Sequence, residues 1–145
     1  MKIIEITEMS QQVLDAFTAL LPQLSSSAKQ PVWEELADMI QSKASIVLAA
    51  VDPDDGNKIY GTLTLVVFRI PTGVRSWIED VIVDQAARGK GIGEMLVNAA
   101  IERAKAEGAK TVDLTSRPSR EAANRLYQRC GFEQRVTNIY RYTIE

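Results

Sequence analysis

Residues 88–93 read RGKGIG and stand between an apolar run, SWIEDVIVD (residues 76–84), and a segment with helical periodicity, EMLVNAAIERAKAEG (residues 94–108). Three alternating glycines and two cations thus occupy the passage from a predicted strand to a predicted helix. The first N–H groups of a helix have no backbone partner, and the helix macrodipole adds about half a positive charge there. Glycine lets an anion approach these groups closely. The stretch therefore predicts a strand–loop–helix unit that can bind a pyrophosphate.

Two common phosphate-loop patterns do not fit this stretch. In the dinucleotide pattern GxGxxG, the third glycine would have to stand at Glu94 or at Leu96, depending on the frame. The Walker pattern requires Ser or Thr after its lysine, whereas Lys90 is followed by Gly91. Asp113 stands about where a ribose-binding acid would, but only one strand–helix–strand unit is available. A nucleotide is therefore a weaker hypothesis for the ligand.

The hydrophobic pattern on both sides of the loop predicts a single mixed α/β domain over residues 1–145, with a central sheet of six to seven strands flanked by about four helices. Residues 46–84 should form an antiparallel meander of three strands. Gly108 and Gly131 should each end a helix, and Ser119 should cap the last one. Strands are predicted at residues 3–6, 46–51, 58–70, 76–84, 111–115 and, in one or two pieces, 132–144; helices are predicted from about residue 13 to Pro22, from Pro31, from Ile92 and from Ser119.

Composition narrows the classes of function. The 145 residues carry a formal net charge of -2, so we expect no basic surface for nucleic acid. Glu5 and Glu8 interrupt the N-terminal segment and no later apolar run reaches membrane-spanning length, so we expect a cytoplasmic protein without a membrane partner. Histidine is absent and Cys130 is the only cysteine, which excludes an internal disulfide and histidine-activated nucleophiles. We expect no metal site.

Two motifs resemble those of one enzyme family. Arg88, Gly91 and Gly93 match the pattern R/Q-x-x-G-x-G/A, and NRLYQRCGF (Asn124 to Phe132) is similar to N-x-x-Y-x-x-x-G-F. Both belong to the GNAT superfamily of N-acetyltransferases. The predicted order of strands and helices also matches, so the resemblance covers essentially the whole chain.

The resemblance implies that acetyl-CoA is the cosubstrate. The loop would bind its pyrophosphate, and the preceding strand would pair with the pantetheine arm, whose two amides can extend a ladder as a peptide does. In the family this strand is opened by splaying from the next one. The implied cofactor-binding residues are Val81, Ile82, Val83, Arg88, Gly89, Lys90, Gly91, Ile92, Gly93 and Asn124.

Glu79 is the candidate catalytic base. An alkylammonium, with a reference pKa near ~10.4, must lose a proton before it attacks a thioester, and Glu79 could accept it directly or through water. A partly apolar cleft would favour protonation and make Glu79 a better base near neutral pH. The alternative is a surface ion pair with Lys or Arg. Strict alternation predicts that Trp77, Glu79, Val81 and Val83 face one way and that Ile78, Asp80 and Ile82 face the other.

Tyr127 is the candidate catalytic acid, a role that the resemblance implies, and it stands on the same side of its helix as Asn124 at i, i+3. Ordinary pKa values of ~8.5 for a thiol and ~10 for tyrosine make full proton transfer uphill by roughly two kcal/mol, so a strong hydrogen bond to the departing sulfur is favoured. The alternative for Tyr127 is a purely structural role as an aromatic side chain of the core.

A backbone N–H near Val81 or Ile82 would bind the oxyanion. Cys130 is expected in the core, which favours direct transfer in a ternary complex.

Two classes of function remain open on the sequence. The first is an acetyl-CoA-dependent N-acetyltransferase acting on a primary amine of a small molecule or peptide. The second is a non-catalytic acyl-CoA-binding regulatory module; the candidate acid and base favour the first. The resemblance implies that residues 13–40 contribute to the acceptor wall, and this stretch carries no diagnostic chemistry. Residues 135–144 could complete a homodimer interface through an edge strand.

Overall fold

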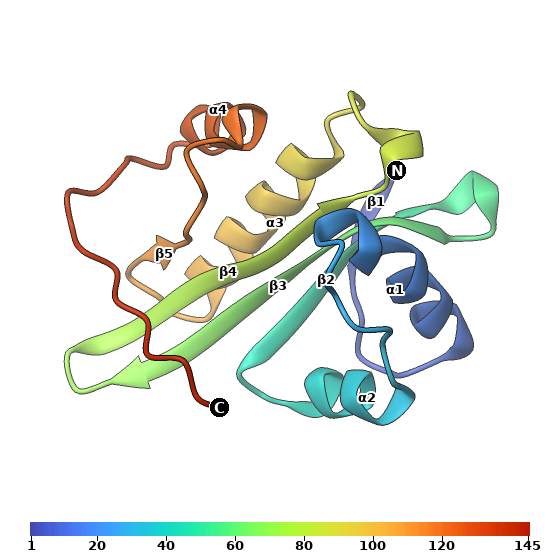
Figure 1. Ribbon diagram of the computed structural model, residues 1–145, viewed down its shortest axis with the longest axis horizontal. Coiled ribbons are helices and arrows are strands. Elements are labelled where there is room, and N and C mark those ends of the chain that lie inside the picture. Colours follow the sequence, from blue (N-terminus) through green and yellow to red (C-terminus); the bar gives the residue numbers. More distant parts are fainter.

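One mixed sheet forms the centre of the chain, and helices cover both of its faces (Figure 1). The computed structural model describes all 145 residues. Its strands are β1 (Lys2–Glu5), β2 (Ser45–Asp52), β3 (Lys58–Ile70), β4 (Gly73–Val83) and β5 (Val112–Asp113). They follow one another across the sheet in chain order; every pair is antiparallel except β4 and β5, which run parallel. The predicted meander is confirmed as β2, β3 and β4.

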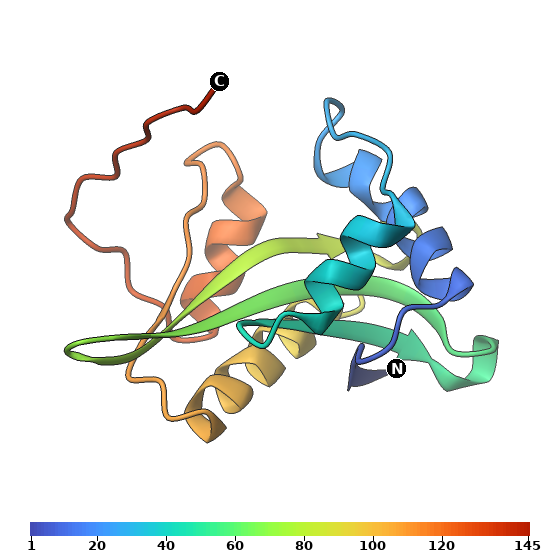
Figure 2. The same cartoon turned by 90° about the horizontal axis from the view of Figure 1, so that it is seen from below.

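The helices divide between the two faces of the sheet. They are α1 (Gln11–Leu24), α2 (Trp33–Gln41), α3 (Ile92–Ala106) and α4 (Glu121–Arg129). Figure 2 shows α1 and α2 on one side of the sheet and α3 on the other. Helix α4 contacts α3 and packs against the same buried cluster. None of these helices has the length and apolar character that crossing a bilayer requires.

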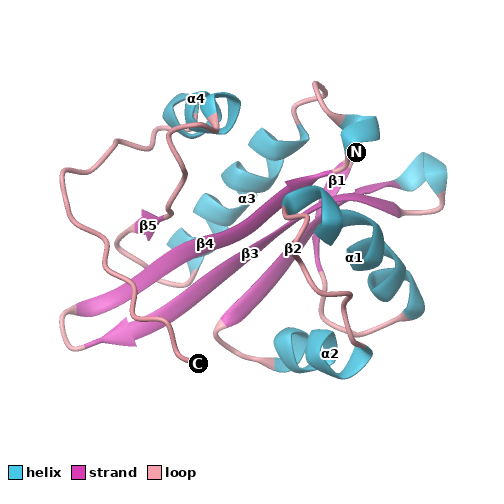
Figure 3. Cartoon of the chain, in the orientation of Figure 1, coloured by secondary structure: helices cyan, strands magenta, loops and turns pink.

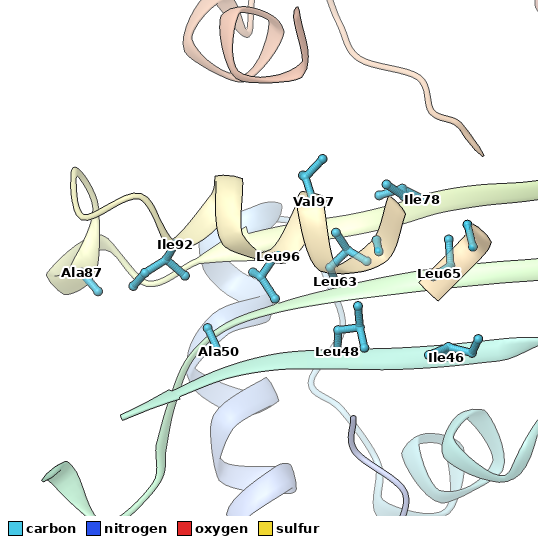
Figure 4. Packing of buried hydrophobic residues seen from close by; sticks show 12 residues of the cluster. Ile46, Leu48, Ala50, Leu63, Leu65, Ile78, Ala87, Ile92, Leu96 and Val97 are labelled. Carbon is cyan, nitrogen blue, oxygen red and sulfur yellow. The ribbon is translucent and has the colours of Figure 1, made fainter. Parts of the chain in front are cut away.

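Each face of the sheet has its own buried cluster, because successive strand residues point to opposite sides. On the α3 side, Leu63 of β3 meets Leu96 of α3, and both are fully buried (Figure 4). On the other side, Val47 of β2 packs with Phe17 of α1. The sheet is therefore fixed between two layers, which holds β4 and the loop after it in place.

The sheet has five strands, so the prediction of six to seven is wrong. Strand β5 keeps only two residues, and residues 132–144, predicted as closing strands, have no regular structure (Figure 3). Five large apolar side chains of this segment are 71–106% exposed. Without burial there is no packing within the chain to hold the segment as a strand.

Strand β4 contains a β-bulge at Asp80. This residue has φ +50°, in the left-handed region, and the register of β4 against β3 shifts opposite Thr62 and Thr64. A bulge inserts one unpaired residue and so reverses the alternation of the residues beyond it.

The bulge corrects the predicted faces of β4. Ile78, before it, lies in the α3-side cluster, whereas Ile82, after it, lies in the cluster under α1 and α2. Val81 and Val83 pack against the α3-side cluster. The prediction that these two valines share a face with Glu79 is therefore wrong.

Two helix boundaries in the structure differ from the predicted ones. Helix α1 continues past Pro22 for two residues and closes with a bond from the Ser25 N–H to the carbonyl of Leu21. Helix α4 begins after Arg120, with no side-chain cap, so Ser119 does not cap it. Proline and serine mark these ends only approximately, because the neighbouring backbone decides where the helix stops.

The predicted glycine ends of α3 and α4 are confirmed. Gly108 and Gly131 have φ +82° and +100°. At the end of α4, the Gly131 N–H donates to the carbonyl of Gln128 and the Phe132 N–H to that of Tyr127, each at 3.0 Å. These are the two bonds of a Schellman motif. The backbone of Tyr127 is thus part of the helix closure.

Gly61 of β3 provides a test of this packing. A methyl group there would lie 3.0 Å from the carbonyl oxygen of Ile82 and 3.2 Å from side-chain atoms of Ile92 and Leu96. Because the oxygen belongs to the β3–β4 ladder, Gly61→Ala should lower the free energy of unfolding by about 1–3 kcal/mol. Thermal denaturation should show a clear fall in Tm, whereas Arg69→Ala, at an exposed position of β3, should leave it nearly unchanged. Equal Tm values for Gly61→Ala and wild type would contradict this packing.

Candidate active site

Strands β4 and β5 part almost as soon as they pair. Only Ser76 and Trp77 of β4 have partners in β5, at Val112 and Asp113. Beyond them β4 keeps β3 on one side and has no strand on the other. The peptide groups from Ile78 onward therefore form a free edge that an extended ligand can join.

A cavity of about 120 Å³ opens where the two strands part. Glu79 and Val81 of β4 line it together with Tyr127 of α4, so three predicted site residues meet there. Leu24 at the end of α1 and Leu114 just beyond β5 also line this cavity. A carboxylate and a phenol thus face a small space beside the free edge of β4.

The loop RGKGIG leads from β4 to the N-terminus of α3 in a conformation that depends on its glycines. Gly89 and Gly91 have φ +80° and +77°, and a methyl group on either would meet nothing within 4 Å. The first helical bond runs from the Met95 N–H to the Gly91 carbonyl, so the N–H groups of residues 92–94 have no acceptor. Both cations of the loop are exposed and form no ion pair. The loop and the start of α3 thus bring free N–H donors, the positive end of a helix dipole and two unpaired cations into one short stretch, a combination that favours an anion.

Two residues of this loop have side-chain positions directed into the protein. Ile92 is 2% exposed and belongs to the α3-side cluster. A methyl group on Gly93 would lie 3.2 Å from Leu126, so this glycine lets α3 and α4 approach closely. Both residues can offer only backbone groups to a ligand.

Glu79 and Asp80 are exposed carboxylates beside the cavity, and neither forms an ion pair. The alternative of a surface ion pair therefore does not apply to them. The side chain of Glu79 is exposed, although apolar residues such as Leu24 and Leu114 line the cavity beside it. Glu79 can still accept a proton directly or through water. Asp80, on the bulge, is a second carboxylate of the cavity that the motifs did not indicate.

Tyr127 is half-buried, and this burial raises the pKa of its phenol, while the charge of Arg120 opposes the rise. Its ring meets the edge of Phe132, with centroids 6.0 Å apart. Tyr127 packs against the α3-side cluster and also lines the cavity. It is therefore both an aromatic residue of the core and a residue of the candidate site. The raised pKa widens the gap to a thiol and strengthens the interpretation of Tyr127 as a hydrogen-bond donor.

The raised pKa predicts a late ionisation. In an alkaline titration followed by phenolate absorbance, wild type should show a component above pH ~10 that Tyr127→Phe lacks. Because the folded pKa exceeds the unfolded one, neutral Tyr127 stabilises the fold fully below the unfolded pKa, and this stabilisation is lost as pH rises through the folded value. Tyr60, whose pKa is raised by its hydrogen bond to Asp55, supplies the control, because Tyr60→Phe should remove a different late component. A titration of Tyr127→Phe that superimposes on that of wild type would exclude the buried phenol.

Asn124 lies one turn before Tyr127, as predicted, but it does not line the cavity. Its amide N–H donates to the carbonyl of Arg117 at 3.0 Å and so ties the preceding loop to α4. Arg120, which no motif indicated, does line the cavity. One sequence signal could have indicated Arg120. It stands just before a helix, where a short polar residue that caps the helix is usual.

Cys130 is half-buried and packs against the α3-side cluster, as expected. Burial raises the pKa of its thiol. Because the thiolate is the nucleophilic form, this environment disfavours an acetyl-cysteine intermediate.

A larger cavity of about 410 Å³ lies between α1 and the start of β3. It contains none of the predicted site residues and has no tyrosine. The smaller cavity, which combines the free edge with a carboxylate and a phenol, is therefore the candidate active site.

Known proteins share this architecture. Residues 10–132 match the model of the Acetyltransferase (GNAT) family. Glucosamine 6-phosphate N-acetyltransferase 1 of Oryza sativa subsp. japonica is 31% identical over 143 residues, which cover 96% of this chain and 84% of that protein. Probable glucosamine 6-phosphate N-acetyltransferase 2 of the same plant is 35% identical over 134 residues, 87% of this chain and 79% of that protein. The solved structure of a putative acetyltransferase from Agrobacterium tumefaciens str. C58 has a TM-score of 0.86 at 23% identity and covers 99% of this chain and 100% of that chain. The chain therefore belongs to the GNAT family of acetyltransferases and is an N-acetyltransferase.

Proposed function

We propose that this enzyme transfers an acetyl group from acetyl-CoA directly to a primary amine in a ternary complex. One observation carries the proposal: the free edge of β4 leads from the Glu79–Tyr127 cavity to the unpartnered N–H groups at the start of α3. An extended carrier with a thioester at one end and a pyrophosphate at the other fits that path.

The donor would be held mainly by backbone groups. Val81, Ile82 and Val83 offer peptide groups of the free edge to the pantetheine amides. The N–H groups of residues 92–94, with Arg88 and Lys90, offer donors and charge to the pyrophosphate. The side-chain amide oxygen of Asn124 has no partner and could accept a hydrogen bond from the cofactor.

The cavity residues then supply the chemistry. Glu79 accepts the ammonium proton, directly or through water, and the amine nitrogen attacks the thioester carbon. A backbone N–H near Val81 or Ile82 stabilises the oxyanion. When the carbon–sulfur bond breaks, Tyr127 donates a hydrogen bond to the sulfur, and the second proton of the attacking nitrogen, released as the amide forms, passes through water to the leaving thiolate.

An amino sugar phosphate is the acceptor class to test first. The two rice relatives are named for glucosamine 6-phosphate, and they cover most of this chain at 31% and 35% identity. The cavity also combines unpaired carboxylates, which suit an ammonium, with Arg120, which suits an anionic group.

Calorimetry and a thiol-release assay test the proposal. Acetyl-CoA should bind with a measurable heat, and CoA should be released only when an amine is present. Glucosamine 6-phosphate should be the best substrate in a panel with glucosamine, spermidine and a lysine peptide. Mass spectrometry of the enzyme with acetyl-CoA alone should find no acetylated protein if transfer is direct.

Other outcomes separate the alternatives. Saturable acetyl-CoA binding without turnover on any amine would favour a non-catalytic acyl-CoA-binding module. Competition by ATP with no binding of acetyl-CoA would favour a nucleotide ligand. Absence of acetyl-CoA binding would refute the donor assignment itself.

A further inference from the structure

The last turn of α1 borders both parts of the proposed site. Leu24, the final residue of α1, lines the cavity that is the candidate active site. Gln23, one position earlier, forms a hydrogen bond to the short 3-10 turn Gln85–Ala87, which connects β4 to the RGKGIG loop. One turn of helix therefore touches the cavity and also the segment that leads into the anion-binding loop.

Both ends of the Gln23 amide have partners. Its oxygen accepts a hydrogen bond from the Gln85 N–H at 2.9 Å, across 62 positions of the sequence. Its nitrogen donates to the carbonyl of Ala19, one turn back in α1, at 3.2 Å. A reversed amide would set N–H against N–H and oxygen against oxygen, so only one orientation satisfies both partners. The side chain is thereby held between its own helix and the turn after β4.

The Gln85 N–H needs a partner from outside its own turn. It is the first N–H of a short helical turn, and such groups have no backbone acceptor within the turn. The next N–H, of Ala86, is bound by the side chain of Asp84 at 3.0 Å. Gln23 is the only side chain from elsewhere in the chain that forms a hydrogen bond with residues 84–93. The start of the loop is therefore held from α1 as well as from β4.

We propose that Gln23 is a positioning residue, which holds Gln85 so that the loop at residues 88–93 keeps the conformation that receives the pyrophosphate of acetyl-CoA. The turn contributes little rigidity of its own, because the Arg88 N–H meets the carbonyl of Gln85 only at 3.4 Å. Without Gln23 the loop samples other conformations, and the apparent affinity falls with the fraction that remains competent to bind. The inference rests on the proposed function, since it requires acetyl-CoA to bind at this loop.

The same helix offers a matched control at Gln12. The amide nitrogen of Gln12 donates to the carbonyl of Asn57 at 2.8 Å, so this side chain also ties α1 to a distant turn. Gln12 lines the larger cavity and not the candidate active site. Methionine at position 12 or 23 keeps the length and the helical preference of the side chain but removes the amide.

Calorimetry and steady-state kinetics measure the effect on the cofactor. Gln23→Met should weaken acetyl-CoA binding by about two- to tenfold, which corresponds to the loss of one ordinary hydrogen bond. At saturating acetyl-CoA its kcat should stay close to that of wild type, because the catalytic side chains are unchanged. Gln12→Met should bind acetyl-CoA as wild type does. An unchanged Kd in Gln23→Met, or an equal loss in both variants, would overturn the inference.

Hydrogen exchange followed by NMR tests the contact without any ligand. The amide of Gln85 should exchange more slowly in wild type than in Gln23→Met. The amide of Leu14, which donates to the carbonyl of Ser10 near the start of α1, should exchange alike in both proteins. Equal exchange at Gln85 would show that Gln23 does not hold the loop. If wild type failed to bind acetyl-CoA, the proposed function would be refuted, whereas exchange at Gln85 would still decide whether Gln23 positions the turn.

Discussion

Tyr127→Phe should lower turnover by roughly tens of fold or more while it leaves the affinity for acetyl-CoA unchanged. The substitution removes the hydroxyl that meets the leaving sulfur, but it keeps the ring that packs on Phe132 and the backbone that closes α4. Steady-state kinetics with the best amine of the panel would give the loss in kcat. Calorimetry would show the unchanged Kd for acetyl-CoA.

Tyr60→Phe is the matched control for this prediction. The Tyr60 hydroxyl donates to Asp55 at 2.7 Å, and Tyr60 does not line the candidate site. Its loss should leave kcat close to that of wild type. Unchanged turnover in Tyr127→Phe would refute the role of its hydroxyl, even if acetyl-CoA binds as proposed.

Gly91→Ala should weaken acetyl-CoA binding by about tenfold. Gly91 has φ +77°, a conformation that costs an L-residue roughly 1–2 kcal/mol, so the loop of the free variant should relax to another conformation. Binding would then have to restore the original loop, and about 1.4 kcal/mol of that cost corresponds to a factor of ten in Kd. The methyl group would also stand in the open space where the pyrophosphate is proposed to lie. Calorimetric titration with acetyl-CoA would measure the loss.

Gly108→Ala is the control that separates an effect on acetyl-CoA binding from the general cost of placing alanine in a left-handed conformation. Gly108 has φ +82°, and a methyl group there likewise meets nothing within 4 Å, but this residue ends α3 far along the helix from the loop. Its variant should lose a similar amount of stability and bind acetyl-CoA as wild type does. If both variants bind equally well, the loop is not the pyrophosphate site.

Much of this fold could be predicted because its local signals agree with its tertiary packing. Glycines in the left-handed conformation end α3 and α4 where the sequence placed them, since few other residues adopt that backbone. The antiparallel meander and the strand–loop–helix unit were predicted from alternation and periodicity. The base and acid roles predicted for Glu79 and Tyr127 require the two side chains to lie close together, and both line one cavity.

The errors came from features that depend on neighbouring elements. Asp80 has a left-handed backbone, which Asp adopts more readily than most residues, but nothing in the sequence marked a bulge at this position of an apolar run. Strict alternation therefore put Val81 and Val83 on the wrong face. The closing strands predicted from residues 132–144 did not form, because a strand needs an edge to pair with as well as an alternating pattern. Arg120 reaches the cavity only through the path of the loop before α4, which no local pattern encodes.

The Schellman motif at Gly131 separates helix α4, which carries Tyr127, from the C-terminal residues 133–145. Its bonds join backbone atoms of residues 127–132, so the orientation of the Tyr127 phenol owes nothing to any side chain after Phe132. Substitutions of side chains in the last thirteen positions should therefore leave the backbone that carries the Tyr127 phenol in place.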